Sequence, residues 1–237
     1  MEIKQCRVCS SENLKFILSL GNQYVTNFVD SEKDHENIPK VPLELVLCED
    51  CKLLQLKHNA PPESMWGDQY WYKSGISSTI RDDLKDIADS SEKLVNLQAK
   101  DIVVDIGCND GTLLEFYDIE GIDLVGFEPS RNVAKEAKEK GLNVINDFFN
   151  AKKFREKFGD KKAKIITAIS MFYDLENPNN FLQDIVSILD KEGLFVIQQN
   201  YLAFMLKQNA FDNICHEHRE YYSLLSLKNL LNRYNLE

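Results

Sequence analysis

The sequence predicts an α/β protein with a parallel, doubly wound sheet of about five strands, preceded by a small metal-binding domain. Three observations carry this prediction. From residue 101 onward, short apolar runs alternate with amphipathic segments of helical spacing, a pattern typical of a parallel sheet covered on both faces. A glycine-containing segment follows the first of these runs, and two C-x-x-C pairs lie near the N-terminus.

Residues 1–75 are expected to form a small, loop-rich domain organised by a metal ion. This part holds four paired cysteines, four of the six prolines and both tryptophans. Two residues between cysteines let a tight turn aim both thiolates at one ion, and two such pairs complete a tetrahedral site suited to structural zinc. The predicted ligands are Cys6, Cys9, Cys48 and Cys51. His58 is a substitute candidate because it follows the last cysteine by seven residues.

Residues 76–237 are expected to alternate helices and strands. Apolar residues at helical spacing predict helices at 76–98, 130–140, 178–189 and 226–234. Short apolar runs predict strands at 101–106, 123–127, 143–145, 164–170 and 193–199. The chain stops where another strand would follow, so we expect either a fragment of a longer protein or a short relative.

The segment after the first predicted strand, residues 105–112, is a candidate cofactor loop that opens a helix. Glycine lets the backbone turn tightly and approach a ligand closely there. Glu128 follows Gly107 by 21 residues, at the end of the second strand, where a carboxylate can accept hydrogen bonds from ribose hydroxyls. A dinucleotide fingerprint would also need glycine at the positions of Asn109 and Thr112.

The pattern Asp-x-Gly-x-Asn-x-Gly in this loop resembles the first motif of class I methyltransferases that use S-adenosylmethionine (SAM). The resemblance implies a Rossmann-like sheet and a SAM site. In that site the loop holds the methionine end, Glu128 holds the ribose, and residues after the third strand border the adenine. The residues so implied are Asp105, Gly107, Asn109, Gly111, Glu128, Asp147 and Phe148.

The densest cluster of functional side chains lies at 211–223, after the fifth predicted strand. Histidine titrates near neutrality and can take a proton, and a neighbouring carboxylate can orient it. His218 and Glu217 are therefore candidates for acid–base chemistry. A metal site that includes His216 and His218, or a plain polar loop with one capping histidine, are the alternatives.

With these motifs, the chain from Cys6 to its end resembles the C-methyltransferases of nucleotide-linked 4-keto sugars. The resemblance also includes the Tyr70–Ser74 segment. It implies that His218 is the general base, that Glu217 supports it or contacts the sugar, and that Tyr70 or Tyr72 donates to the enolate oxygen. Two departures stand out: Cys215 replaces a tyrosine that relatives often carry, and the family's second C-terminal domain is missing.

Composition excludes several other classes. The formal net charge of -10 opposes indiscriminate binding of nucleic acid. Uncharged apolar runs fall short of the ~20 residues of a membrane span, and the charged N-terminus is not a signal peptide. We therefore expect a cytoplasmic enzyme with SAM, structural Zn²⁺ and a nucleotide-linked sugar as its small-molecule partner; the oligomeric state stays open. The alternatives are an O- or N-methyltransferase of a related metabolite and a non-catalytic zinc-containing binding module.

Overall fold

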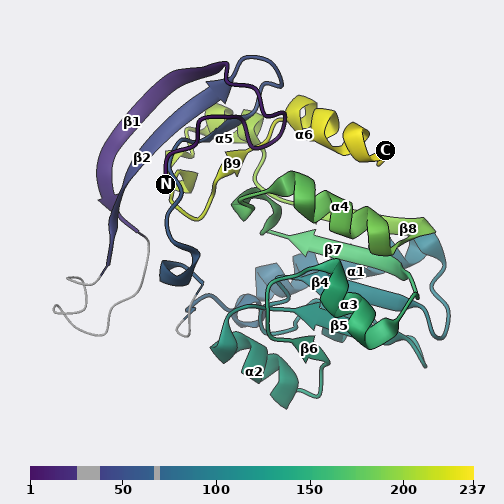
Figure 1. Ribbon diagram of the computed structural model, residues 1–237. Helices are drawn as coiled ribbons and strands as arrows, with labels where there is room; N and C mark the ends of the chain where they lie inside the picture. Colours follow the sequence, from purple (N-terminus) through teal and green to yellow (C-terminus); the bar gives the residue numbers. More distant parts are fainter. Residues whose placement is uncertain (26–37, 67–69) are drawn as a thin grey trace. The chain divides into compact units, whose positions relative to one another are not determined.

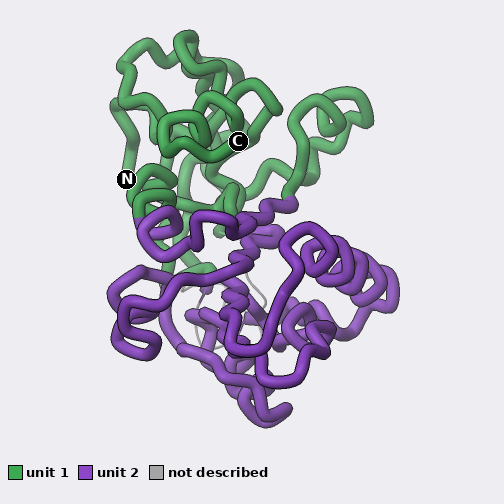
Figure 2. Tube along the Cα trace, turned by 90° about the vertical axis from the view of Figure 1, so that its right-hand side faces the viewer, with its two compact units in different colours: residues 1–65, 172–183, 199–237 green, residues 66–171, 184–198 purple. Residues whose placement is uncertain are grey.

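The computed structural model describes residues 1–25, 38–66 and 70–237. Its contacts divide the chain into two compact units (Figure 2). Unit 1 combines residues 1–65, 172–183 and 199–237, and unit 2 combines residues 66–171 and 184–198. The compact units therefore interleave along the chain, unlike the two consecutive segments that the motifs suggest.

Unit 2 contains the five-stranded parallel sheet that the sequence predicts. Its strands are β4 (Ile102–Ile106), β5 (Asp123–Phe127), β6 (Val144–Ile145), β7 (Ala163–Ile169) and β8 (Leu189–Gln198). They lie in the order β6-β5-β4-β7-β8, and every neighbouring pair is parallel. The strand order reverses between β4 and β7, and ligands of open α/β sheets bind beyond the carboxyl ends of the strands at such a point.

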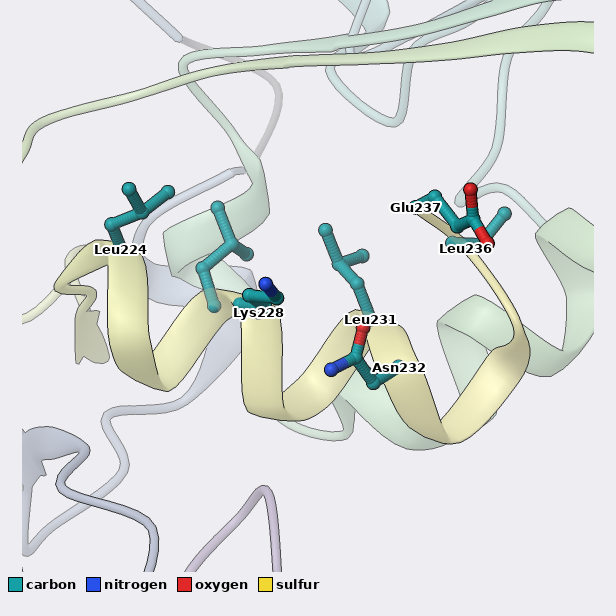
Figure 3. Close-up of a pocket in the computed structure, with 7 residues that line it drawn as sticks. Leu224, Lys228, Leu231, Asn232, Leu236 and Glu237 are labelled. Carbon is teal, nitrogen blue, oxygen red and sulfur yellow. The ribbon is translucent and has the colours of Figure 1, made fainter.

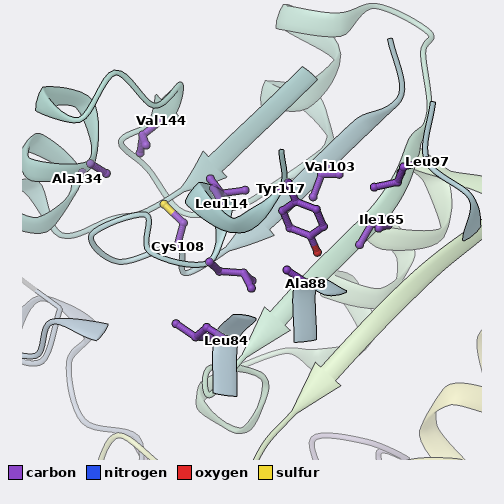
Figure 4. Packing of buried hydrophobic residues seen from close by; sticks show 12 residues of the cluster. Leu84, Ala88, Leu97, Val103, Cys108, Leu114, Tyr117, Ala134, Val144 and Ile165 are labelled. Carbon is purple, nitrogen blue, oxygen red and sulfur yellow. The ribbon is translucent and has the colours of Figure 1, made fainter. Parts of the chain in front are cut away.

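Helices cover this sheet on both faces. α1 (Ser78–Val95) and α2 (Arg131–Glu139) share one apolar core with β4 and β7, part of which Figure 4 shows around Tyr117. α3 (Ala151–Phe158) lies beside the end of α4 (Pro178–Ile188), where Arg155 Nη2 donates to the Ser187 carbonyl at 3.2 Å. In Figure 1, α3 lies in front of the sheet and α1 behind it. α4 begins in unit 1 and ends in unit 2.

One local expectation for unit 2 was wrong, and one helix was not predicted. The glycine loop does not open an α-helix: a short 3-10 helix, η4 (Leu114–Phe116), follows it. α3 was not predicted, because it has eight residues and buries just Ala151 and Phe154, too few to show a helical period. Its start depends on Asn150, whose side chain accepts a hydrogen bond from Lys153 N at 3.0 Å, satisfying an otherwise unpaired helix donor.

Unit 1 is built on an antiparallel sheet, and the expectation of a loop-rich domain was wrong there. The strands are β1 (Leu14–Tyr24), β2 (Lys40–Cys48), β3 (Leu54–Leu56) and β9 (Glu220–Tyr221), in the order β1-β2-β3-β9. β1 escapes prediction because most of its side chains are exposed and its register shifts twice against β2. Both features blur the alternation of polar and apolar residues by which a strand is recognised.

The last part of the chain completes this sheet. Leu54 pairs with Tyr221 and Gln55 with Glu220, so β9 extends a sheet whose other strands come from the first 56 residues. Leu43, Leu45, Leu56 and Tyr221 form its buried core. The remaining elements of the unit are α5 (Leu202–Gln208), α6 (Leu224–Leu231), η2 (Pro62–Ser64), η5 (Phe172–Asp174), η6 (Phe211–Asn213) and η7 (Asn232–Tyr234); η3 (Ser74–Ile76) belongs to unit 2. Within the described ranges, no helix combines the length and apolarity needed to cross a membrane.

Candidate functional site

The four paired cysteines of unit 1 converge on one point. The sulfur atoms of Cys6, Cys9, Cys48 and Cys51 all lie within 4.8 Å of one another. The Cys6–Cys51 and Cys9–Cys48 sulfurs are 3.5 Å apart, and all six cysteines of the chain are free. Zn–S bonds of about 2.3 Å in a tetrahedron separate the sulfurs by about 3.8 Å. The cluster therefore has the size that a zinc ion requires.

The protonation of this cluster also suits a metal. The hydrogen bond between the Cys6 and Cys51 sulfurs lowers the pKa of Cys6 to about 5 and raises that of Cys51. The cluster therefore favours one thiolate among its four sulfurs. A bound cation would favour the thiolate form of all four cysteines. His58 lies elsewhere, with its Nε2 atom 3.2 Å from Glu44 Oε2. Four thiolates fill the coordination shell, so the ion has a structural role.

The candidate cofactor loop of unit 2 depends on two glycines with left-handed backbones. Gly107 has φ +72° and Gly111 has φ +80°. A Cβ atom at Gly107 would lie 3.2 Å from Met171 Cγ, and one at Gly111 would collide with Leu142. Cys108 also packs against Gly126, which has no room for a side chain, so this cysteine is a buried filler of the turn.

Two buried carboxyl groups lie at the strand ends beside this loop. Asp105 is in β4 and accepts a hydrogen bond from Thr167 Oγ1 at 2.6 Å; burial raises its pKa to about 7. Glu128 directly follows β5 and accepts from Asn109 N at 3.0 Å and from Ser130 N at 2.8 Å. Burial raises the pKa of Glu128 as well, against the lowering effect of these two amides. Each oxygen of Glu128 keeps a second lone pair for a ligand hydroxyl.

The Asn109 side chain holds a neighbouring segment. Its Oδ1 accepts from Ser74 N, and its Nδ2 donates to the Tyr72 carbonyl, both at 3.0 Å. Asp110 adds a third contact, because its Oδ2 accepts from Gly75 N at 3.0 Å. The segment Tyr70–Gly75, which we call the aromatic strap, is thereby fastened to the cofactor loop. The role of Asp110 was not predicted, although it lies inside the motif.

The aromatic strap is bonded to the cofactor loop at Tyr72 and to α2 at Tyr70. The Tyr70 carbonyl accepts from Asn132 Nδ2 at 2.6 Å, and Lys73 Nζ lies 2.6 Å from Glu136 Oε1. Burial raises the pKa of the Tyr72 phenol, so this hydroxyl keeps its proton and can donate a hydrogen bond.

Asp147 and Phe148 follow β6, at the same edge of the sheet as Glu128. The Asp147 carboxylate pairs with Lys153, which lowers its pKa, and it accepts from Phe148 N at 2.7 Å. The Phe148 side chain is 52% exposed. An exposed aromatic ring at this edge of the sheet is suited to stacking on a planar base.

His218 lies in unit 1, and its hydrogen bond fixes its tautomer. Its Nδ1 atom is 2.8 Å from the Asn213 carbonyl, and its ring lies 4.4 Å from the ring of Tyr173, centroid to centroid. A carbonyl only accepts, so Nδ1 carries the proton and Nε2 presents a lone pair. Burial lowers the pKa of His218, which keeps the ring neutral at pH 7. No motif or spacing indicated Asn213 or Tyr173 as partners of His218.

Two buried carboxyl groups of the same unit, Glu217 and Asp174, lie near one another. Burial raises the pKa of Glu217. Burial, and then the charge of Glu217, raise the pKa of Asp174 well above its ordinary value. Asp174 Oδ1 is buried without a hydrogen-bond partner among the described residues. The raised pKa values favour the neutral forms of Glu217 and Asp174. The sequence did not indicate Asp174 as a neighbour of Glu217.

His216 has a different role from His218. It is 2% exposed, and its Nε2 donates to the Val41 carbonyl at 3.0 Å. Each histidine is thus bound to its own backbone carbonyl. The four cysteines are the single group of histidine, cysteine and carboxylate ligands able to hold a metal in the described part of the chain.

A surface hollow in unit 1 lies apart from all these residues. Figure 3 shows it along α6, where Leu224 and Leu231 point to the same side. Its lining contains none of the predicted site residues. The predicted site residues form two clusters, one in each unit: the cofactor loop with the aromatic strap in unit 2, and His218 with Glu217 in unit 1.

Two families of known proteins match the chain. The methyltransferase domain family matches residues 73–237, which is more than half of the sequence. The chain belongs to the methyltransferase domain family. A zinc binding domain family matches residues 6–66, a range that holds all four clustered cysteines.

Relatives of this methyltransferase domain include C-methyltransferase NovU of Streptomyces niveus. It is 30% identical over an alignment of 237 positions, which covers 99% of this chain and 56% of NovU. The chain thus spans little more than half the length of that relative.

Solved structures share the fold. A SAM dependent methyltransferase from Archaeoglobus fulgidus has a TM-score of 0.52 at 21% identity, covering 65% of this chain and 68% of that one. The plantazolicin methyltransferase BpumL, in complex with S-adenosylhomocysteine (SAH), has a TM-score of 0.52 at 18% identity, covering 63% and 61%. Both confirm the predicted methyltransferase sheet.

Proposed function

We propose that the chain is the cofactor- and base-bearing part of a SAM-dependent C-methyltransferase that acts on a nucleotide-linked keto-sugar. The observation that carries the proposal is the fixed tautomer of His218, whose Nδ1 is 2.8 Å from the Asn213 carbonyl. A neutral histidine with an oriented, basic Nε2 suits the removal of a weakly acidic proton. The 30% identity to C-methyltransferase NovU supports the same reaction class.

Unit 2 fits the cofactor. Asp105, Gly107 and Gly111 would hold its amino-acid end, and Glu128 its ribose. Asp147 and Phe148 would border its adenine. Asn109 contributes by donating its backbone N–H to Glu128, while its side chain holds the aromatic strap. SAM supplies an electrophilic methyl group when bound.

The chain's own residues then move the proton. His218 Nε2 removes a proton from the carbon beside the sugar ketone, and the electron pair of that C–H bond becomes an enolate. Tyr72 or Tyr70 donates a hydrogen bond to the enolate oxygen, and Glu217 supports His218 or contacts the sugar. The enolate carbon would form the new bond to the methyl group as the bond between that methyl group and the sulfur of SAM breaks, so that SAH leaves and the ketone is restored. An oriented donor to an oxyanion contributes about 3 kcal/mol.

The zinc ion takes no part in these steps, because its shell is closed by four cysteines. Residues 1–75 would supply the metal site, and residues 76–237 would supply the cofactor site and the base. Free cysteines are typical of a reducing compartment, so the proposed location is the cytoplasm.

The first test is a calorimetric titration of zinc-loaded protein with SAH. We expect micromolar binding, and no binding by folded protein contradicts the proposal and favours a non-catalytic module. The second test incubates the protein with nucleotide-linked 4-keto sugars in D₂O without SAM. Deuterium at the carbon beside the ketone supports carbon methylation. Methyl transfer without exchange at that carbon would favour an oxygen or nitrogen acceptor.

A further inference from the structure

We propose that Arg7 is a positioning residue, which sets the loop of Glu217 and His218 through Glu220 and so links the zinc site to the base. This inference rests on the proposed role of His218. The zinc domain then contributes to methyl transfer as well as to stability, although no step passes through the ion. All the residues concerned belong to unit 1.

Arg7 lies inside the first pair of predicted zinc ligands, and its side chain is 3% exposed. Its Nη1 donates to the Leu56 carbonyl at 2.6 Å and to Gln55 Oε1 at 3.2 Å. Its Nη2 donates to Asn59 Oδ1. The guanidinium is therefore held by β3 and by the residues that follow it. Its planar fork gives it one direction, which a lysine in its place could not keep.

The remaining nitrogen of Arg7 faces Glu220. Arg7 Nε lies 3.8 Å from Glu220 Oε1, and the Glu220 side chain is fully buried. Both Glu220 oxygens lack a hydrogen-bond partner among the described residues. A buried carboxylate needs a counter-charge. Burial raises the pKa of Glu220, and the charges of Arg7 and then of Arg219 lower it. Arg7 lies 3.8 Å from the carboxyl group, whereas the guanidinium of Arg219 also bonds to Glu176 at 3.5 Å and to the Ala60 carbonyl at 3.4 Å.

Glu220 is two residues from His218, and the backbone between them is tied on both sides. Leu56 N donates to the Arg219 carbonyl at 2.8 Å, and Arg219 N donates to the Tyr173 carbonyl at 2.9 Å. Tyr173 is also the residue whose ring contacts His218. A shift of Glu220 would therefore move both the His218 backbone and the ring that packs against it.

The direction of Arg7 depends on the turn between Cys6 and Cys9. Asn179 Nδ2 donates to the Arg7 and Val8 carbonyls at 2.7 and 3.0 Å, which holds the turn from outside. A bound ion would hold the same turn from inside through both cysteines. The Arg7 side chain then transmits this fixed geometry to Glu220.

The test reads the His218 ring directly by ¹⁵N NMR, with the resonance assigned through H218N. In the wild-type protein we expect the tautomer protonated at Nδ1. R7M removes the positive charge that faces Glu220, and E220Q removes the carboxyl group that faces Arg7. In both we expect the His218 ¹⁵N shifts to move toward a mixture of tautomers. K57Q removes an exposed ion pair of the same unit, 3.0 Å long, and should leave the His218 shifts unchanged.

A merely structural role of Arg7 would leave the tautomer as in the wild type. Wild-type His218 shifts in R7M and E220Q that still bind one zinc would overturn the inference. R7K keeps a cation beside Glu220 and should give a smaller shift change; it decides the matter where the other two variants do not fold. With turnover available, R7K should lower kcat about tenfold with little change in KM, since small misplacements cost rate. Failure of wild-type protein to bind SAH would instead contradict the proposed function and leave the NMR result standing.

Discussion

At the scale of single residues, the described site depends on which atoms hold protons. His218 keeps its proton on Nδ1 because the Asn213 carbonyl accepts it. Asp105 holds a proton into the neutral range because burial raises its pKa to about 7. Asp105 is therefore close to half-protonated near pH 7, whereas His218 is neutral there, because burial lowers its pKa.

H218N should lower kcat by a factor of about 10²–10⁴, which is the usual contribution of a general base. SAH affinity should stay within twofold, because the hydrogen bond of His218 goes to the Asn213 carbonyl and not to a residue of the cofactor loop. H58N is the matched control, since His58 faces Glu44, and it should stay active. Turnover by H218N equal to the wild type would remove His218 from the mechanism.

The pH profile of kcat should follow the same histidine. Burial lowers the pKa of His218, so the basic form persists below the usual histidine range. We expect kcat to stay level as the pH falls to about 6.5 and to decline at lower pH, once the ring becomes protonated. A decline that begins above pH 7 would show that another group is the base.

Asp105 should make stability depend on pH in a defined direction. Its folded pKa of about 7 exceeds its unfolded value, so the folded state binds an extra proton between the two. The free energy of unfolding therefore falls as the pH rises toward 7, by up to about 1.4 kcal/mol per pH unit from this group. D105N should flatten that slope in urea titrations. An unchanged slope would mean that Asp105 is ionised in the folded protein.

At the scale of elements, the aromatic strap is the feature that joins loop and tyrosines. N109A removes the acceptor of Ser74 N and the donor to the Tyr72 carbonyl. At about 1 kcal/mol for each lost hydrogen bond, we expect amide exchange at Ser74 to accelerate more than tenfold. Mass spectrometry of the peptide over 70–77 measures this rate. N180A, at an exposed asparagine of unit 1, should leave the rate unchanged.

The start of α3 offers a prediction that is independent of function. N150A removes the side chain that accepts from Lys153 N and should lower the free energy of unfolding by about 1 kcal/mol. N150D keeps an acceptor and should retain most of the stability. Equal losses in both variants would show that the amide, rather than the cap, matters at this position.

The sequence predicted elements well where both faces of a strand are buried. β4 is apolar except for Asp105 and wholly buried, and its glycine turn follows at once, so strand and loop could be placed together. α5 was missed because Phe204 and Leu206 are exposed, which removes the amphipathic pattern. The cysteine ligands could be named from spacing alone, because their geometry is local.

Long-range partners could not be predicted in this way. Asn213 and Tyr173 meet His218, and Arg7 meets Glu220, through contacts that the fold creates between distant parts of the chain. Spacing carries no information about them. The roles of Glu217, Tyr70 and Tyr72 stay predictions of the resemblance and await the experiments above.

At the scale of the whole molecule, the zinc site should be removable by a substitution that leaves the cofactor residues unchanged. We expect one zinc ion per chain, measured by metal analysis, and its loss in C48S. Structural zinc contributes on the order of 10 kcal/mol in small domains, so C48S should unfold unit 1 at a much lower temperature. C108S alters a cysteine outside the cluster and should retain the metal. Full zinc content in C48S would contradict the four-cysteine site.

The interleaved units also bear on how the protein is made. Residues 1–65 leave the ribosome first, but β9 of the same sheet lies at Glu220–Tyr221. During synthesis the zinc turns can close early, while Arg7 waits for its carboxylate until β9 has been translated. Unit 2 can assemble its sheet in that interval. The charge pair between Arg7 and Glu220 thus forms later than the zinc turns, and the loop of Glu217 and His218 acquires its shape only after the residues of unit 2 have been made.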